Sequence, residues 1–351
     1  MQILSVDREH ILEKTSGIWE PLRNKRLFIT GGTGFVGTWL IEAFVAANEA
    51  YDLRSQACIL TRDPSAFASR SNHLATHESI TLQQGDAATF DAPPGEFSHV
   101  IHAATQRWFS PDPIYPLGIL EPDFVATRRV LDFAKSHGTD RILFTSSGAV
   151  YGPSASRLEN IAEDFEGAPN PISPSATYGE SKRLSEFAVM SYSRTYSFNA
   201  IIARLFAFIG PHLPLDEGYA VGNFIADALH ERDITIKGDG TPRRSYLYSA
   251  DLAIWLWTIF LGAESRSVYN VGSPNAISIK DLAEKVVATL APKAQVHIAA
   301  SPISGSAPHN YIPNVSRAQN DFQLLAWIDL DEALRRTYQF NSLARRNKDN
   351  S

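Results

Sequence analysis

The feature that most constrains the fold is a glycine-rich turn between an apolar segment and a helical pattern. Residues 26–30 are typical of a short buried strand, the turn follows as TGGTGFVG, and residues 38–48 have helical periodicity. Glycines at this spacing permit a sharp turn, a close approach of the backbone to a pyrophosphate, and tight packing of helix on strand. A glycine turn alone is a weak signal, but a strand before it and a helix after it predict a dinucleotide site. The residues expected to bind the cofactor here are Gly31, Thr33, Gly34, Phe35, Val36 and Gly37.

Strands and helices alternate through the first two thirds of the 351 residues. This alternation predicts an α/β protein with a Rossmann-like, doubly wound parallel sheet. The second part has shorter, mixed elements and predicts a smaller α/β substrate lobe at the C-terminal end. The strands are expected at 26–30, 57–60, 80–84, 99–103, 141–145 and 200–205, and later at 268–271 and 295–299; the helices are expected at 38–48, 121–136, 176–195, 222–230, 279–290 and 330–337.

The expected domain limits follow from this change of rhythm. Residues 1–25 form an N-terminal helical extension, and 26–205 with about 234–262 form the NAD(P)-binding domain. Residues of about 206–233 and 263–343 form the substrate lobe, and 344–351 a frayed tail.

Composition narrows the class of partner and the compartment. The net charge of −6 and the pI near 5.9 argue against nucleic acid as a partner. The apolar run at 252–261 is about half the length of a membrane span and predicts a buried helix. The N-terminus carries charges where a signal peptide would be apolar, and the single cysteine, Cys58, predicts a buried thiol. We therefore expect a cytoplasmic protein with no membrane partner and no metal site.

The residues after the second to fourth strands predict the remaining cofactor contacts. Arg62 suits the extra phosphate of NADP(H) and favours it, while the neighbouring Asp63 keeps NAD(H) open. The alternative is that Arg62 is a solvated loop charge. His102 is expected to be a packed strand residue and not a catalyst. Further cofactor contacts are expected from Asp86, Ala87, Ala103 and Ala104.

A tyrosine and a lysine four residues apart predict acid–base chemistry. Tyr178 and Lys182 share one face of the predicted helix 176–195. An ammonium group favours the phenolate and brings a tyrosine towards a useful pKa. Any YxxxK can occur by chance as a solvated pair, so the context matters. Ser147 supplies it, because its hydroxyl follows a strand at the edge where parallel sheets bind ligands.

With these motifs in place, the chain resembles the extended short-chain dehydrogenase/reductase family of nucleotide-sugar epimerases, dehydratases and reductases. TGGTGFVG, IHAAT, TSSGAVYG, YGESK, ARLFAFIGP and GDGTPRRSYLYSADLA occur in the family's order, from about residue 27 to 340. The resemblance implies that Ser147 binds the sugar oxygen, Tyr178 is the acid/base, and Lys182 binds the nicotinamide ribose and supports the phenolate. It also implies that Tyr178 and Lys182 contact the cofactor, and that Asn223 and Arg244 bind the nucleotide-sugar substrate.

One departure from the family pattern bears on the reaction. In the family's 4,6-dehydratases an Asp–Glu pair follows the catalytic hydroxyl, but here Gly148 and Ala149 follow Ser147. The resemblance therefore implies 4-keto reduction or C4 epimerisation of a nucleotide-activated hexose. The alternatives are a nucleotide-sugar 4,6-dehydratase and a non-catalytic NAD(P)-binding regulator on the same fold. The family also implies a homodimer formed through the helices 121–136 and 176–195, where Phe187 and Met190 are apolar residues expected on the exposed face.

Overall fold

The computed structural model describes residues 2–105, 117–215, 217–301 and 309–349. The chain divides into two compact units, each formed from three segments. The first unit comprises Met1–Gly152, Gly167–Leu205 and Ala253–Tyr269; the second comprises Pro153–Glu166, Phe206–Leu252 and Asn270–Ser351.

A seven-stranded sheet forms the centre of the first unit. Its order is β11-β6-β5-β4-β1-β2-β3, and the pairs from β6 to β3 are parallel. The direction of strand progression reverses between β1 and β4, which is where open α/β sheets bind ligands. The predicted doubly wound sheet is confirmed. The strands are β1 (Arg26–Thr30), β2 (Gln56–Thr61), β3 (Ile80–Gln84), β4 (His99–His102), β5 (Arg141–Ser147), β6 (Asn199–Leu205) and β11 (Ser267–Val271).

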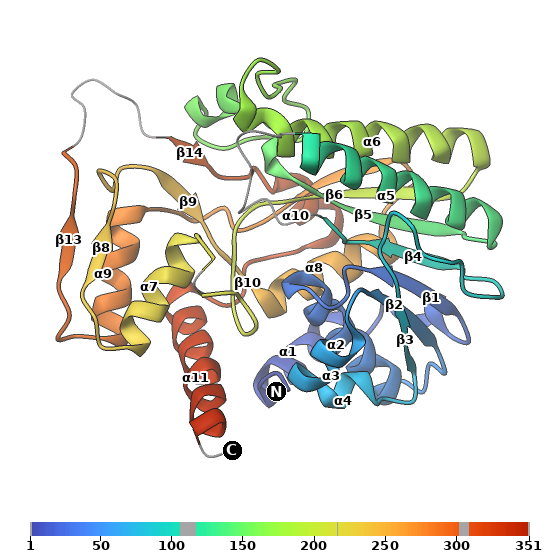
Figure 1. Cartoon of the computed structure of the whole chain (residues 1–351), viewed down its shortest axis with the longest axis horizontal. Coiled ribbons are helices and arrows are strands. Elements are labelled where there is room, and N and C mark those ends of the chain that lie inside the picture. Colours follow the sequence, from blue (N-terminus) through green and yellow to red (C-terminus); the bar gives the residue numbers. More distant parts are fainter. Residues whose placement is uncertain (1, 106–116, 216, 302–308, 350–351) are drawn as a thin grey trace. The chain divides into compact units, whose positions relative to one another are not determined.

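Helices cover both faces of this sheet (Figure 1). Helices α5 (Leu117–Ser136) and α6 (Thr177–Tyr196) lie side by side on one face. Helix α2 (Phe35–Ala50) lies on the other, together with α8 (Ser249–Gly262), whose Trp257 donates to the Leu40 carbonyl. The short helices α3 (Pro64–Arg70) and α4 (Asn72–Ala75) connect β2 to β3. The predicted buried helix at 252–261 is therefore the body of α8.

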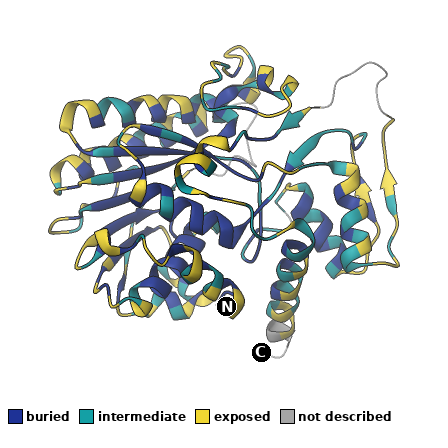
Figure 2. Cartoon of the chain, turned by 180° about the vertical axis from the view of Figure 1, so that it is seen from behind, coloured by how far each residue is buried: buried dark blue, intermediate teal, exposed yellow. Residues whose placement is uncertain are grey.

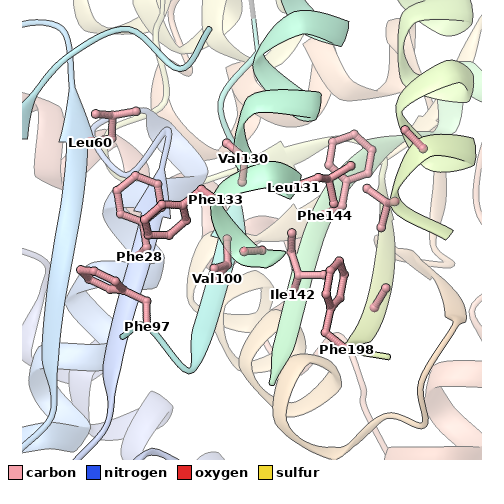
Figure 3. Packing of buried hydrophobic residues seen from close by; sticks show 14 of the residues in the cluster. Phe28, Leu60, Phe97, Val100, Val130, Leu131, Phe133, Ile142, Phe144 and Phe198 are labelled. Carbon is pink, nitrogen blue, oxygen red and sulfur yellow. The ribbon is translucent and has the colours of Figure 1, made fainter. Parts of the chain in front are cut away.

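An aromatic cluster fills the layer between the sheet and the α5–α6 pair (Figure 3). The ring of Phe28 on β1 lies 4.4 Å from that of Phe133 on α5 and 5.9 Å from that of Phe97. The central strands are buried along almost their whole length (Figure 2), as expected for parallel strands with helices on both faces. Cys58 belongs to the same cluster and is buried, as predicted.

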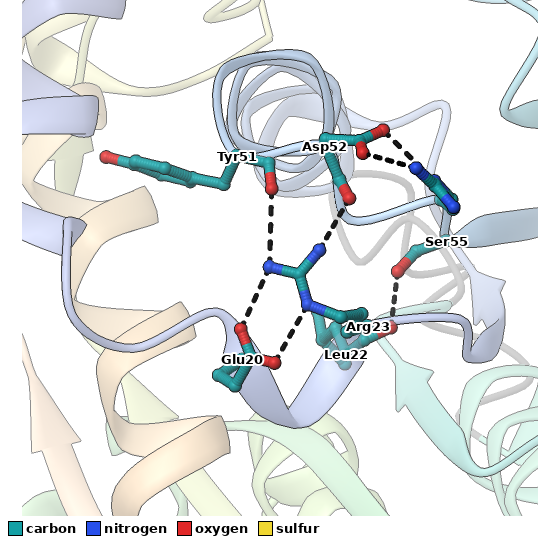
Figure 4. A network of polar contacts seen from close by, with 7 residues as sticks. Glu20, Leu22, Arg23, Tyr51, Asp52 and Ser55 are labelled. Carbon is teal, nitrogen blue, oxygen red and sulfur yellow. Dashed lines mark hydrogen bonds and ion pairs between the residues drawn. The ribbon is translucent and has the colours of Figure 1, made fainter.

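The N-terminal extension packs on α2 and α8. It consists of α1 (Ser5–Thr15) and a single 3-10 turn, η1 (Glu20–Leu22). Trp19 is buried against Trp257, with 4.9 Å between ring centroids. Arg23 then ties the extension to the end of α2: it donates to both Glu20 carboxylate oxygens, at 2.8 and 2.9 Å, and to the Asp52 carbonyl at 2.6 Å (Figure 4).

The second unit contains three small sheets and four helices within its described residues. The sheet order β12-β9-β14 places β9 (Arg243–Ser245) between β12 (Ala276–Ser278) and β14 (Asn310–Tyr311). The other two sheets pair β8 (Ile234–Ile236) with β13 (Val296–Ile298), and β7 (Phe208–Ile209) with β10 (Leu247–Tyr248). The helices are α7 (Ala220–Leu229), α9 (Ile279–Leu290), α10 (Ser316–Phe322) and α11 (Leu330–Asp349).

Two features of this unit differ from the sequence-based expectation. Residues 234–252, expected in the NAD(P)-binding domain, fall in the second unit because β8, β9 and β10 all pair with strands of that unit. The last helix, expected at 330–337, continues to Asp349 and so includes most of the tail expected to fray. Arg345 donates to the Leu229 carbonyl at the end of α7 at 3.1 Å, which anchors the additional turns.

Candidate active site

The glycine turn after β1 is packed so closely that side chains are excluded at two positions. Gly31 has φ +71°, and a Cβ there would lie 2.4 Å from the carbonyl carbon of Ala103. A Cβ at Gly37 would lie 2.2 Å from the Gly31 carbonyl oxygen. These two glycines therefore let α2 approach the end of β1 and let the turn approach the end of β4.

Gly34 has a different function, because a Cβ there would meet only the Gly31 oxygen, at an ordinary 3.4 Å. It is exposed and is the N-cap of α2, and among the described residues no side chain caps the helix there. The first turn of α2 contains no carboxylate, and Phe35 and Val36 follow half-buried. Backbone N–H groups at such a helix start, with a glycine leaving room in front of them, fit a pyrophosphate.

Small residues and a carboxylate border this turn at the ends of β3 and β4. The amides of Ala103 and Ala104 donate to the carbonyl and hydroxyl oxygens of Thr30, at 3.1 and 3.3 Å, so the chain stays close to β1. After β3, the Asp86 carboxylate accepts from the Ala88 amide at 2.9 Å, and Ala87 packs against the aromatic core. The structure thus places all four predicted residues at the carboxyl edge of the sheet.

A hydroxyl and an arginine lie at the tip of β2, and a second arginine lies at the end of the following helix, α3. Thr61 is buried, with its hydroxyl 3.4 Å from that of Thr33 in the glycine turn. Asp63 accepts from the Ala66 amide at 2.9 Å and thereby caps α3, while Arg62 is exposed. Arg70, at the end of α3, donates to the Thr33 carbonyl at 3.2 Å. Sequence reasoning missed Arg70, because nothing in the pattern connects it with a turn 37 residues earlier.

The predicted catalytic residues come from the start of α6 and the end of β5. Tyr178 is half-buried, and the Lys182 Nζ lies 5.8 Å from the centroid of its ring. Lys182 is 4% exposed and donates to the Thr145 carbonyl at 3.1 Å. Burial lowers the pKa of this ammonium, and the carboxylates of Asp123 and Glu186 oppose that effect.

Ser147 is the last residue of β5 and begins the 3-10 turn η2 (Gly148–Tyr151). Its hydroxyl oxygen accepts from the Ala149 amide at 3.2 Å. Gly179 brings the start of α6 against this turn, since a Cβ there would lie 2.6 Å from the Ala149 carbonyl oxygen. The glycine within YGESK was not predicted to matter, yet it allows the tyrosine helix and the serine turn to touch.

His102 is a packed strand residue, as expected. Its ring nitrogens lie 2.7 Å from the Thr30 hydroxyl and 3.1 Å from the Thr127 hydroxyl. Burial, with a smaller contribution from the charge of Lys182, lowers the pKa of the imidazole to about 3. The ring is therefore neutral at physiological pH and unsuited to general-base catalysis.

The two predicted substrate contacts lie in the second unit. Arg244, on β9, donates to the carbonyls of Arg243 and His309 at 2.8 and 2.9 Å, and its guanidinium lies 5.7 Å from the Tyr311 ring centroid. Burial lowers its pKa, and no carboxylate within the described ranges forms an ion pair with it. A partly buried guanidinium without a counter-charge is suited to an anionic ligand. Asn223 lies half-buried on α7.

No cluster of three or more His, Cys, Asp or Glu side chains could hold a metal ion in the part of the chain that the structure describes. Likewise, none of the helices described here combines the length and the apolar character needed to span a membrane.

Comparison with known proteins decides the family. The sequence model of the NAD dependent epimerase/dehydratase family matches residues 27–272, well over half of the chain. The chain belongs to this family. Among curated relatives, UDP-glucuronic acid decarboxylase 2 of Arabidopsis thaliana is 29% identical over 309 residues, covering 86% of this chain and 64% of that protein. UDP-glucuronic acid decarboxylase 1 of Danio rerio is 29% identical over 325 residues, covering 91% and 73%. This chain thus spans less than two thirds of the first of these relatives.

Solved structures of the same fold include several nucleotide-sugar enzymes. UDP-glucose 4-epimerase from Thermotoga maritima, with UDP-glucose, has a TM-score of 0.75 at 18% identity and covers 91% of this chain and 99% of its own. UDP-glucuronic acid 4-epimerase from Bacillus cereus, with UDP-glucuronic acid and NAD, has a TM-score of 0.75 at 20% identity and the same coverage. The predicted resemblance to nucleotide-sugar epimerases and dehydratases is confirmed, and the fold is theirs.

Proposed function

We propose that this protein is an enzyme that oxidises and reduces C4 of the hexose in a nucleotide-activated sugar. The outcome is 4-epimerisation or 4-keto reduction. Two features support the proposal: a dinucleotide-type turn at the start of α2, and a catalytic trio formed by Ser147 at the end of β5 with Tyr178 and Lys182 near the start of α6. These residues carry the same roles in either outcome.

The relatives' reactions share one chemical step. A ketone at C4 stabilises an electron pair at C5 as an enolate, so it allows either loss of CO2 from a carboxylate on C5 or removal of the C5 proton followed by loss of the C6 hydroxyl. The same ketone can also be reduced from either face. UDP-glucuronic acid decarboxylases, 4-epimerases and a dTDP-glucose 4,6-dehydratase are all among the similar proteins. Oxidation and reduction at C4 is therefore the step that all of these reactions share, and the residues around C4 determine which product forms.

The observation that favours epimerisation or ketoreduction over dehydration is the sequence of the turn after Ser147. Elimination from C5 and C6 needs an additional acid or base near the catalytic hydroxyl. Here η2 begins with Gly148 and Ala149, and the Ala149 amide is itself bound to the Ser147 hydroxyl. A turn without a carboxylate favours returning hydride to C4 over expelling a group from C6. Epimerisation and ketoreduction are thus preferred to dehydration.

The residues of this chain transfer the proton of the C4 hydroxyl and orient the sugar. The glycine turn and the amides at the start of α2 would hold a nicotinamide dinucleotide, which would supply the hydride acceptor and donor. Tyr178 removes the proton from the C4 hydroxyl and returns it. Lys182 stabilises the phenolate, because its ammonium lies beside the ring in a buried, weakly screened position. Ser147 donates a hydrogen bond to the sugar oxygen and fixes its orientation.

The tip of β2 favours NADP(H) as the cofactor, and this supports the ketoreductase in particular. Asp63 caps α3 and Arg62 is exposed, while Arg70 reaches the Thr33 carbonyl in the glycine turn. Two guanidinium groups suit a ribose 2′-phosphate. Similar structures that contain a cofactor hold NAD or NADH, so a preference for NADP(H) would distinguish this chain from them. Fluorescence titration should show tighter binding of NADPH than of NADH, and Arg62→Ala should abolish the difference; equal affinities would contradict the NADP(H) proposal.

A substrate panel tests the activity. The purified protein is incubated with UDP-, GDP-, CDP- and dTDP-hexoses and their 4-keto forms, with reduced cofactor followed by absorbance and sugars by chromatography. We expect one nucleotide series to react, and Tyr178→Phe to lower kcat at least about 100-fold. Tyr196→Phe, on the exposed face of the same helix, is the matched control and should be fully active. Full turnover by Tyr178→Phe would refute the catalytic assignment.

A further inference from the structure

A second set of charges lies along the same helix face as the catalytic pair. Tyr178, Lys182 and Glu186 follow one another at intervals of four residues on α6, which places them on one side of the helix. Glu186 is buried and is not part of the YxxxK pattern. A buried carboxylate needs specific partners, so its contacts indicate what it does there.

Glu186 connects three elements around the catalytic centre. Its Oε1 accepts a hydrogen bond from the Ser146 hydroxyl on β5 at 2.5 Å and one from the Arg204 Nε on β6 at 3.0 Å. Its Oε2 accepts from the Arg204 Nη2 at 2.8 Å. The two side chains are only 11% and 15% exposed. This is a two-point ion pair in a poorly screened setting, the strongest geometry available to these groups.

The contacts of the pair converge on the serine turn. Ser146 is the neighbour of Ser147 and stands opposite Arg204 in the β5–β6 register. The Arg204 guanidinium also lies 4.7 Å from the ring centroid of Tyr151, the last residue of η2. The ion pair therefore touches the strand that ends in Ser147, the turn that follows it, and the helix that carries Tyr178 and Lys182.

We propose that Glu186 and Arg204 are positioning residues for the catalytic centre. This inference rests on the proposed function. The pair holds α6 against the end of β5 and balances the charge around Lys182 and Tyr178. Stability alone does not explain it well, because a buried ion pair is often no more stabilising than apolar side chains of similar size. Its value here is that it fixes both the geometry and the electric field of the site.

The charges facing Lys182 form a balanced set. On its own helix they are Tyr178 and Glu186; Asp123 faces it from α5, and the neutral His102 from β4. Arg204 joins through Glu186. Asp123 is buried and accepts from the hydroxyls of Thr105 and Ser181, at 2.8 and 3.4 Å. Within the part of the chain that the structure describes, two cations thus accompany two carboxylates, and removal of any one of these four residues leaves an excess charge.

The two partners of the ion pair leave an excess charge of opposite sign when they are removed, so their variants should change the titration of Tyr178 in opposite directions. Glu186→Gln leaves Arg204 without its counter-charge, so the site becomes more positive and the phenolate of Tyr178 is favoured. Arg204→Met leaves Glu186 without its partner, so the site becomes more negative and the phenolate is disfavoured. Eight helical residues span about 12 Å, where a unit charge at an effective dielectric near 20 moves a titration by about one pH unit.

The experiment measures the acidic limb of kcat/KM against pH in the full-length holoenzyme. We expect this limb to move about one pH unit lower in Glu186→Gln and about one higher in Arg204→Met. The double variant Glu186→Gln/Arg204→Met should return to the wild-type position. The matched control is Glu180→Gln, on the same helix, whose carboxylate lies 3.8 Å from Arg183 in a surface pair; its profile should not move.

A purely structural pair would give a different result. In that case both single variants would lose activity equally at every pH with the limb unmoved, and the proposal would be wrong. A spectroscopic readout keeps the outcome separate from that of the proposed function. The ultraviolet phenolate signal of Tyr178, taken as the difference from the same variant carrying Tyr178→Phe, needs no substrate. If no nucleotide sugar reacts, the proposed function fails, but opposite displacements of this titration still support the positioning pair and identical titrations still refute it.

If Glu186→Gln or Arg204→Met fails to fold, two other variants test the proposal. Glu186→Asp keeps the charge, and the double variant keeps the balance, so both should titrate Tyr178 as the wild type does. A displaced titration in the double variant would overturn the proposal.

Discussion

Alanine substitutions at three glycines of the first unit, Gly37, Gly34 and Gly17, can distinguish a glycine needed for folding from one needed for cofactor binding. At Gly37 a Cβ would lie 2.2 Å from the Gly31 oxygen and 2.4 Å from the Gly32 Cα, against about 3.4 Å for ordinary contact. Both obstacles are backbone atoms of the same turn, so α2 must shift by about 1 Å. Overpacking of this kind costs about 1–3 kcal/mol. At about 2–4 °C per kcal/mol, Gly37→Ala should lower Tm by roughly 2–12 °C.

Gly34→Ala should behave differently. Its Cβ meets only the Gly31 oxygen at 3.4 Å, so Tm should change by less than about 2 °C. We expect the new methyl group to occupy space that the pyrophosphate needs at this helix start, so cofactor affinity should fall at least about tenfold, or about 1.4 kcal/mol. Gly17→Ala is the control, because nothing lies within 4 Å of its Cβ; it should leave both quantities unchanged.

Differential scanning fluorimetry and titration of reduced-cofactor fluorescence measure the two quantities on the same preparations. The decisive result is a separation: stability lost in Gly37→Ala, and affinity lost without stability in Gly34→Ala. Wild-type affinity in Gly34→Ala would refute the placement of the pyrophosphate at the start of α2. An unchanged Tm in Gly37→Ala would refute the packing argument.

Three further predictions concern other parts of the chain. Arg244→Leu should raise KM for the nucleotide sugar about 10- to 100-fold with kcat changed less, because we propose that this partly buried guanidinium, which forms no ion pair with a carboxylate of the described residues, binds the diphosphate; an unchanged KM would exclude that contact. His102 takes up a proton near pH 6.5 when unfolded but only near pH 3 when folded, so its contribution to stability is complete above pH 6.5 and is lost as the pH falls. Urea unfolding at pH 7 and pH 4.5 should therefore show a smaller loss for His102→Asn than for the wild type, and equal losses would argue against the shift. Sedimentation velocity should show a dimer that Phe187→Glu converts to a monomer, since Phe187 on α6 is 70% exposed; a wild-type monomer would exclude the dimer.

The sequence predicted the elements whose signals are long and regular. The glycine turn, the parallel strands and the helices α2, α5 and α6 were expected within a few residues of where they lie. Their apolar periodicity is strong because both faces of a parallel sheet must be covered. The position of Ser147 at a strand end, and of Tyr178 and Lys182 on one helix face, followed from the same regularity. The proposed dimer has weaker support from the sequence. Met190, which was expected on the exposed face of α6, packs against the core, so only Phe187 of the two residues is available for an interface.

What the sequence could not predict depends on short elements and distant contacts. Strands of two or three residues, such as β7 (Phe208–Ile209), are too short to show an alternating pattern. The pair formed by Glu186 and Arg204 joins positions 18 residues apart. Arg204 lies in the motif ARLFAFIGP, but Glu186 belongs to none of the motifs, so the sequence does not connect the two residues. Asp63 offered a readable signal, because a carboxylate before a proline is a typical helix start, and the structure uses it as the N-cap of α3.

The identity of the product tests the central claim most directly. Nuclear magnetic resonance of the sugar formed from the reactive nucleotide hexose should show a change confined to C4, either inversion of its configuration or conversion between ketone and alcohol, with C5 and C6 intact. Tyr178→Phe should form this product at least about 100-fold more slowly than the wild type. A pentose or a 4-keto-6-deoxy sugar as the product, or the same product from Tyr178→Phe at the wild-type rate, would contradict C4 redox chemistry through Ser147, Tyr178 and Lys182.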